Sequence, residues 1–136
     1  MGLFIVAATL IKNKVDVYLI IRTLFLSAIF VTLYGFGQIY LNFPVISTSN
    51  SEFSKGTILY LTDGARVSST FAGHYDLAIY LSIIIILSFS IVFYYSSLNN
   101  KLFLVITSVF HFILLGFTAA RVSFVATLIG FLFISK

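Results

Sequence analysis

Long apolar stretches alternate with short polar segments along the chain. Residues 24–43, 77–95 and 102–120 carry no charged side chain over 20, 19 and 19 positions. Because a helix needs about 20 apolar residues to cross a hydrocarbon core of about 30 Å, each stretch predicts a full membrane span. Two shorter runs, residues 2–11 and 122–135, predict partial spans. We therefore expect an all-α protein, a polytopic transmembrane helical bundle with three full and two partial spans.

The longest polar segment, residues 44–76, separates the first two full spans. Pro44 can end the preceding helix, because proline lacks the N–H group that a helix interior requires. A polar run follows at residues 47–52, and residues 57–62 fit either a short strand or a piece lying at the membrane interface. One long loop is predicted here.

The basic residues predict how the spans are oriented. Cytoplasmic loops of membrane proteins carry an excess of Lys and Arg. Five basic residues fall on one predicted side and three on the other, so the first side is predicted to be cytoplasmic. Residues 12–22 and 96–101 then form cytoplasmic loops, whereas residues 44–76 and 118–121 are external. The first group is Lys12, Lys14, Arg22, Lys101 and Lys136, and the second is Lys55, Arg66 and Arg121.

Composition supports a lipid environment. The chain is 60% hydrophobic and 9% charged, with a mean hydropathy of +1.13, whereas a soluble domain is about 45–50% apolar and about 25% charged. The absence of cysteine excludes disulfides, iron–sulfur clusters and thiolate zinc sites. The net charge of +4 comes from singly scattered basic residues, which excludes a nucleic-acid-binding patch. We interpret residues 1–136 as one transmembrane region that is part of a larger polytopic domain.

Small and polar residues share one face of the first predicted span. At about 100° per residue, Ala28, Thr32, Gly35, Gln38 and Asn42 fall within an arc of about 120°. Such a face lets helices approach closely and hydrogen-bond in lipid, so we expect it to pack against another helix. For Gln38 and Asn42, near the external end, lining of a polar cavity is the alternative.

His111 lies in the middle of the third predicted span. A hydroxyl or carbonyl group of a neighbouring helix can satisfy a neutral imidazole, and we expect this structural role rather than that of a metal ligand or a base. His74 is the only other histidine, and no spacing of carboxylates resembles a set of metal ligands. No metal site is predicted.

Two arginines on the predicted external side are the main candidates for chemistry. Arg66 lies in the long loop, where a salt bridge with Asp63 is one interpretation. Arg121 precedes the last apolar run, where the helix dipole disfavours a cation, so it either reaches the lipid headgroups or faces a polar cavity. A guanidinium group forms two parallel charge-assisted bonds to phosphate oxygens, so a phosphate ligand would suit this pair.

Three segments resemble motifs of the O-antigen ligase and O-antigen polymerase superfamily of bacterial envelope proteins. They occur in the family's order and together cover about residues 24–133. Leu33-Tyr-Gly-Phe-Gly-Gln38 is similar to the YGxxQ that precedes the family's external loop. Arg66-Val-Ser-Ser-Thr-Phe, with Gly73 and Asp76-Leu-Ala-Ile-Tyr-Leu, is similar to R-x-S-G-T-F … N-x-x-A-x-x-L. Thr118-Ala-Ala-Arg121 is similar to T-x-S-R.

Three positions depart from the family pattern. Ser69 replaces a glycine, Asp76 replaces an asparagine, and Ala120 replaces a serine. Family members are also much longer, and a second large external loop carries a histidine thought to act as the base. That histidine has no counterpart here, so the catalytic residue is unknown and we expect the 136 residues alone to be inactive.

The resemblance implies an integral membrane glycosyltransferase at the outer face of the bacterial inner (cytoplasmic) membrane. It would transfer or polymerise saccharide from undecaprenyl pyrophosphate, without a cofactor or metal, to a saccharide, lipid or protein acceptor. Arg66 and Arg121 would bind the pyrophosphate, with Gln38 and Asp76 as secondary candidates. Ligase and polymerase are not distinguished. The alternative is a non-catalytic membrane scaffold or a small transporter subunit, although the uncharged spans argue against ion transport.

Overall fold

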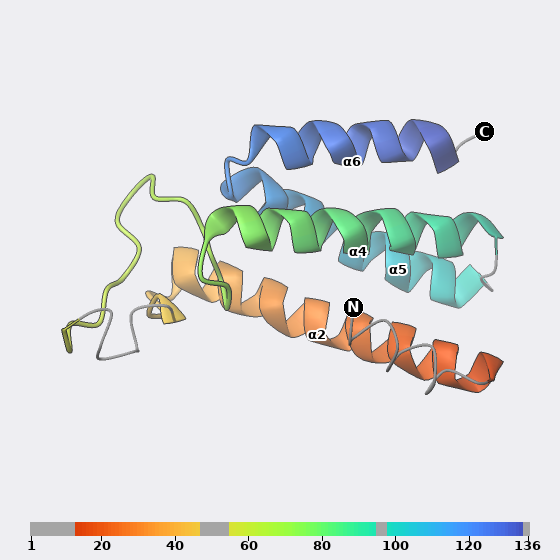
Figure 1. The fold of residues 1–136 in the computed structure, drawn as a ribbon, viewed down its shortest axis with the longest axis horizontal. Helices are drawn as coiled ribbons and strands as arrows, with labels where there is room; N and C mark the ends of the chain where they lie inside the picture. Colours follow the sequence, from red (N-terminus) through yellow and green to blue (C-terminus); the bar gives the residue numbers. More distant parts are fainter. Residues whose placement is uncertain (1–12, 47–54, 95–97, 135–136) are drawn as a thin grey trace, which may run out of the picture.

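The computed structural model describes residues 13–46, 55–94 and 98–134, and the structure in these ranges is helical apart from its connections (Figure 1). No strand forms in the described residues, and the segment 57–62 contributes only an isolated antiparallel bridge between Tyr60 and Pro44. The all-α prediction is confirmed. The predicted partial span 2–11, the polar run 47–52 and Lys136 lie outside the described residues. The helices are α2 (Lys14–Tyr40), α4 (His74–Tyr94), α5 (Leu98–Phe117) and α6 (Arg121–Ile134).

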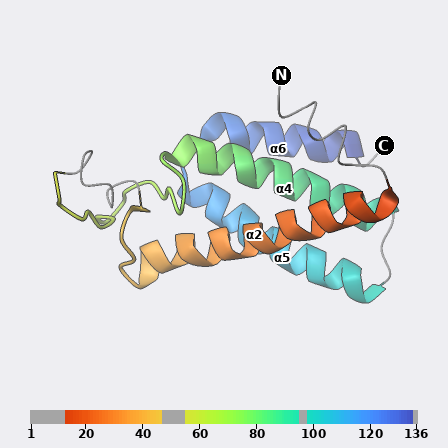
Figure 2. The same ribbon diagram turned by 60° about the horizontal axis from the view of Figure 1, so that its bottom comes forward.

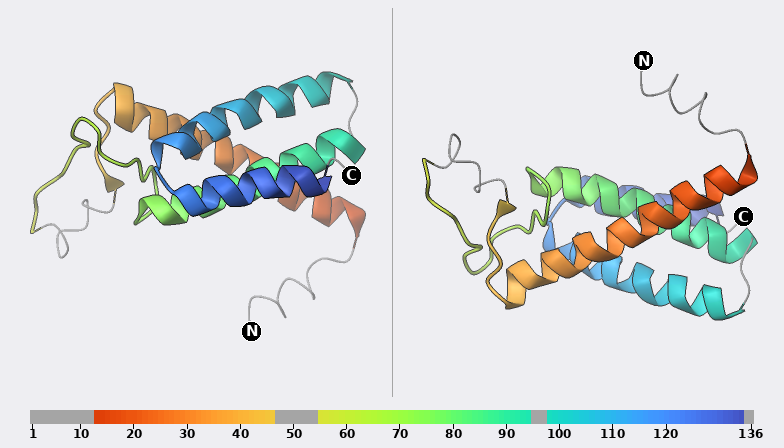
Figure 3. Two further views of the ribbon diagram at one scale, coloured as in Figure 1. Left: turned by 90° about the horizontal axis from the view of Figure 1, so that it is seen from above. Right: turned by 90° about the horizontal axis from the view of Figure 1, so that it is seen from below.

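The helices run back and forth along one long axis. In Figure 1, α4 lies between α6 and α2, and α5 lies behind them. Figures 2 and 3 show that α2 crosses the other helices obliquely. The connection from α2 to α4 and the turn from α5 to α6 therefore lie at one end of the bundle, which we call the loop end. The first residues of α2 and the last of α6 lie at the opposite end.

Two helices are long and apolar enough to cross a membrane, judged by length and composition. They are α2, with 27 residues, and the part of α4 from His74 to Phe93, with 20. The predicted third full span is shorter, because the apolar part of α5 covers Lys101–Phe117 and the chain turns at Thr118. α6 is a 14-residue apolar helix, close in extent to the predicted partial span. Three predicted full spans are thus corrected to two in the described residues.

Both predicted cytoplasmic loops are partly helical. α2 begins at Lys14, well before the predicted span, because the Asp16 carboxylate accepts the Asn13 backbone N–H at 3.0 Å. Reciprocal bonding of this kind satisfies donors that a helix start leaves free. Asn-x-x-Asp before an apolar run was a usable sequence signal, and hydropathy alone misses it. α5 likewise begins at Leu98, inside the predicted loop 96–101.

α2 ends at Tyr40, which corrects the placement of Asn42 on the packing face. Asn42 is exposed and has a φ of 54°, the left-handed conformation common just after a helix. The N–H groups of Leu41 and Phe43 both donate to the Gly37 carbonyl, at 2.9 and 3.1 Å. Asparagine adopts this conformation more readily than most residues, so it serves here as a helix terminator.

The other residues of that face are buried, as predicted. Ala28, Thr32 and Gln38 are 0%, 4% and 1% exposed. A Cβ atom added to Gly35 would lie 2.8 Å from a methyl carbon of Leu114 on α5, so the absence of a side chain permits the close approach. Thr32 Oγ1 and His111 Nδ1 are 3.1 Å apart in a buried hydrogen bond between α2 and α5. The expected structural partner of His111 is therefore confirmed.

The hydrophobic core is centred on α4. Its buried residues include Leu77 and Leu81, which pack with Leu114 and Leu115 of α5. Val67, from the connection between α2 and α4, belongs to the same cluster and is 1% exposed. Burial of Val67 anchors the end of this connection, because apolar area removed from water stabilises by about 25 cal/mol per Å².

Candidate functional site

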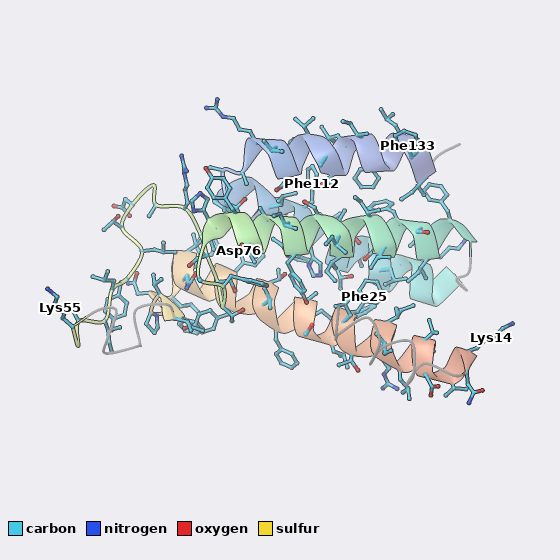
Figure 4. All side chains as sticks on the ribbon, in the orientation of Figure 1. Lys14, Phe25, Lys55, Asp76, Phe112 and Phe133 are labelled. Atoms are coloured by element: carbon cyan, nitrogen blue, oxygen red, sulfur yellow. The ribbon has the colours of Figure 1, made fainter. Side chains whose placement is uncertain are left out.

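The loop end contains the four residues that the sequence singled out as site candidates, Gln38, Arg66, Asp76 and Arg121. Figure 4 shows Asp76 at the start of α4 and Lys55 at the far tip of the connection, away from the helices. The described parts of the connection are residues 41–46 and 55–73. Residues 67–69 are buried, whereas residues 55–60 are exposed. The candidate site therefore lies where the connection returns to the helices.

Gln38 attaches both described parts of the connection to α2. Its Nε2 donates to the carbonyl groups of Pro44 and Ser69, each at 3.1 Å, and its Oε1 accepts the Ser69 N–H at 2.8 Å. Tyr34, one turn earlier, also donates its hydroxyl to the Pro44 carbonyl at 3.0 Å. Both donor positions of the Gln38 amide are thus engaged by backbone groups.

Ser69 is held in an unusual backbone conformation. Its φ is 50°, in the left-handed region that residues other than glycine rarely adopt. The residue is 0% exposed, and its hydroxyl donates to the Val31 carbonyl on α2 at 2.6 Å. With the Gln38 bonds, all three polar groups of Ser69 pair with α2, which stabilises this conformation.

A second attachment joins the connection to the turn between α5 and α6. The Val67 N–H donates to the carbonyl of Phe117, the last residue of α5, at 3.3 Å. Thr118, 0% exposed, donates its hydroxyl to the Leu115 carbonyl at 2.6 Å and accepts the Ala120 N–H at 3.3 Å. The Thr118 side chain thereby links both sides of the turn. α6 starts immediately after the turn, at Arg121.

Arg66 lies beside the start of α4. Its Nη1 donates to Nε2 of His74 at 3.1 Å, and the His74 ring packs on Tyr75 with 4.1 Å between centroids. The predicted salt bridge to Asp63 does not form, because the guanidinium group turns toward His74. Asp76 is exposed in the first turn of α4, where the helix dipole favours a negative charge.

Arg121 lines a hollow of about 410 Å³ at the start of α6. The side chain is exposed, and no acceptor pairs with it in residues 13–46, 55–94 and 98–134. Gly116 and the alanines of the turn leave this hollow open, and a Cβ atom on Gly116 would meet nothing within 4 Å. Arg66 and Gln38 do not line the hollow. Its lining residues are Leu115, Gly116, Ala119, Ala120, Arg121, Phe124 and Val125.

A larger hollow, of about 700 Å³, runs along the outer face of α2 and ends at the connection. Its lining is apolar apart from three hydroxyl-bearing side chains. Thr70, next to Ser69, is the lining residue that comes from the second described part of the connection. The lining residues are Ser27, Phe30, Val31, Leu33, Tyr34, Leu41, Phe43 and Thr70.

Sequence reasoning selected Arg66, Arg121, Gln38 and Asp76 and missed the residues that connect them. Ser69 and Thr118 are buried polar residues whose roles depend on partners more than 30 positions away or on a turn geometry. Their one sequence signal is their place inside the motif-like segments 66–71 and 118–121. No group of three or more potential metal ligands occurs in the described part of the chain.

Comparison of the chain with protein-family models, with curated proteins and with solved structures finds no match.

Proposed function

We propose that this chain is an integral membrane protein that binds a lipid-linked pyrophosphate saccharide and takes part in glycosyl transfer at the outer face of the bacterial inner membrane. In this proposal Arg66 and Arg121 bind the pyrophosphate. The loop end faces outward, and Lys14 lies on the cytoplasmic side. The proposal joins the resemblance to O-antigen ligases and polymerases with the geometry of the loop end.

Exposed apolar side chains support the membrane part of the proposal. Large apolar residues face outward on every described helix: Phe30 is 69% exposed on α2, Val122 is 83% exposed on α6, and Phe133, also on α6, is 75% exposed. In the apolar 18-residue segment of α2, only 11% of the residues are buried. A soluble monomer rarely exposes such continuous apolar surface, whereas lipid accepts it.

One observation carries the proposal: hydrogen bonds join the first motif-like segment to the second, and the second to the residue that precedes the third. Gln38 of the first segment pairs with Ser69 of the second. Val67 of the second pairs with Phe117, next to the third. These bonds hold the three segments together at the loop end.

Two departures from the family pattern fall at backbone positions that explain the usual residue. The family's glycine corresponds to Ser69, whose φ is 50°, a conformation in which glycine is favoured. The family's serine corresponds to Ala120, whose carbonyl accepts the Phe124 N–H and which therefore precedes α6 as its N-cap. Serine is a preferred N-cap residue and alanine is not. The family's glycine and serine would thus both suit the backbone found at these positions, which supports the alignment of the motifs.

The chemistry suits a diphosphate leaving group. When an acceptor hydroxyl attacks the anomeric carbon, negative charge develops on the departing lipid pyrophosphate, and preorganised cations stabilise that charge. The Arg121 guanidinium group has no protein acceptor in the described residues, and Arg66 is bonded there only to a ring nitrogen of His74, with no carboxylate partner. Both are therefore available for phosphate oxygens.

Lipid binding tests the proposed function directly. The full chain in nanodiscs of zwitterionic lipid is expected to bind undecaprenyl pyrophosphate, detected by native mass spectrometry. Undecaprenol, which has the same tail and no phosphate, serves as the control and should bind much more weakly. Equal binding of the two lipids would show that the tail alone is recognised, and the proposed pyrophosphate site would be rejected.

Sided labelling tests the orientation. The chain has no cysteine, so single cysteines can be introduced at the exposed positions Asn13, Lys55 and Ala119. We expect Lys55→Cys and Ala119→Cys to react with a membrane-impermeant maleimide in intact spheroplasts, and Asn13→Cys only after permeabilisation. Labelling of Lys55→Cys and Ala119→Cys from opposite sides would exclude a shared site for Arg66 and Arg121.

A further inference from the structure

We infer that Gln38 is a positioning residue, which fixes the segment carrying Arg66 against the helices and thereby sets the place of Arg66 relative to Arg121. The inference goes beyond a direct substrate contact for Gln38. It is tested in two ways. A measurement of lipid binding, the binding arm, rests on the proposed function, whereas a measurement of the distance between two labels, the distance arm, does not.

The Gln38 amide matches the backbone of Ser69 at two points. Oε1 accepts the Ser69 N–H at 2.8 Å, and Nε2 donates to the Ser69 carbonyl at 3.1 Å, so the side chain pairs with Ser69 as a neighbouring strand would. The second Nε2 hydrogen meets the Pro44 carbonyl at 3.1 Å. A carboxylate lacks both donors, and an aliphatic side chain lacks all three interactions.

Burial makes these bonds decisive for the local structure. Gln38 is 1% exposed and Ser69 is 0% exposed. Removing the amide leaves the Ser69 N–H and carbonyl without this partner, and of the two donors to the Pro44 carbonyl only the Tyr34 hydroxyl remains. Unpaired buried polar groups are strongly unfavourable, so the segment is expected to move until water reaches them.

Movement of Ser69 would displace Arg66, which lies three positions earlier. Between them, Val67 bonds Phe117 at 3.3 Å, four positions before Arg121. The segment 66–69 is thus held by Gln38 and Val31 on α2, by the end of α5, and by the exposed bond from Arg66 to His74. Loss of the Gln38 attachment removes both partners of the Ser69 backbone and leaves the bonds made by the Ser69 hydroxyl, Val67 and Arg66, with the Val67 side chain, to set the separation of the two arginines.

The distance arm uses Gln38→Leu, which keeps the approximate size and removes every hydrogen bond. Spin labels on cysteines introduced at Ala65 and Gly116 report how the connection lies relative to α5; both positions are exposed, and a side chain at Gly116 meets nothing within 4 Å. Thr32→Val is the matched control, because it breaks another buried bond of α2, to His111, without touching the connection.

We expect a narrow distance distribution in the otherwise native chain and in Thr32→Val, and a broad one in Gln38→Leu. Equal distributions in the two variants, at comparable losses of thermal stability, would overturn the inference. A native-like distribution in folded Gln38→Leu would overturn it as well.

The binding arm measures undecaprenyl pyrophosphate in the same variants. Gln38→Leu is expected to bind about 10-fold more weakly or worse, since charge-assisted bonds weaken steeply when distance and angle are lost. Thr32→Val is expected to bind like the native chain. If the native chain itself does not bind this lipid, the proposed function fails while the distance arm still decides the role of Gln38. Unchanged binding by Gln38→Leu, with a broadened distance, would show that this position of Arg66 is not needed.

Discussion

Arg66→Ala and Arg121→Ala are each expected to weaken binding of undecaprenyl pyrophosphate by about 10- to 100-fold, since a hydrogen bond to a charged group contributes about 1.5–3 kcal/mol. The two guanidinium groups lie at the same end of the bundle, and neither is paired with a carboxylate in the described residues. Arg→Lys variants keep the charge and lose the planar fork, so their affinity should fall between those of native and Ala forms. Titration in nanodiscs, read by native mass spectrometry, measures all four.

Lys55→Ala is the matched control for charge. Lys55 carries the same charge on the same connection, but Figure 4 places it at the tip, far from the helices. Its removal changes the net charge as much as removal of either arginine, and it should leave binding within about twofold because exposed charges are screened by salt. If Lys55→Ala weakens binding as strongly as the arginine variants, the lipid is attracted by overall charge and no arginine site exists.

The two arginines are also expected to act on one ligand. The double variant Arg66→Ala/Arg121→Ala should lose less than the sum of the single losses, since groups that hold the same diphosphate are coupled. Strict additivity of the two free-energy losses would indicate two separate anion contacts and would contradict a shared pyrophosphate.

Gly35→Ile is expected to destabilise the bundle by about 1–3 kcal/mol, the usual effect of overpacking. The first atom added, Cβ, would already lie 2.8 and 2.9 Å from the two terminal methyl carbons of Leu114. Leu114 is 0% exposed, so its side chain has little room to move, and α2 would separate from α5. Thermal unfolding in detergent, followed by far-ultraviolet circular dichroism, measures the effect.

Two further variants separate the clash from a general effect of a bulky residue in a helix. Gly116→Ile introduces the same side chain into α5, where a Cβ atom meets nothing within 4 Å, and it should be near neutral. Leu114→Ala in the Gly35→Ile background should recover part of the lost stability, because it removes the atoms that collide. A Gly35→Ile variant as stable as Gly116→Ile would contradict the close packing of α2 on α5.

The sequence alone was sufficient for the all-α architecture and for most of the packing face of α2. Charge-free apolar runs leave helices as the structures that satisfy their own backbone groups, and small residues at Ala28 and Gly35 permit close approach of another helix. The hydropathy pattern was insufficient at helix ends. Asn13 with Asp16, Asn42 and Thr118 set three boundaries through local hydrogen bonds or a left-handed residue, which a hydropathy pattern does not contain.

At the candidate site too, some features could be predicted from the sequence and others depended on the tertiary structure. Residue type was enough to single out Arg66 and Arg121 as candidates, because a guanidinium group forms two parallel charge-assisted bonds to phosphate oxygens. Tertiary structure alone decided that Arg66 pairs with His74, and that Gln38 is enclosed by backbone groups. Ser69 keeps a left-handed conformation only because α2 supplies partners for all its polar groups. Those partners lie 31 and 38 positions away, and a pairing at such separation depends on how the helices pack, which no local stretch of sequence specifies.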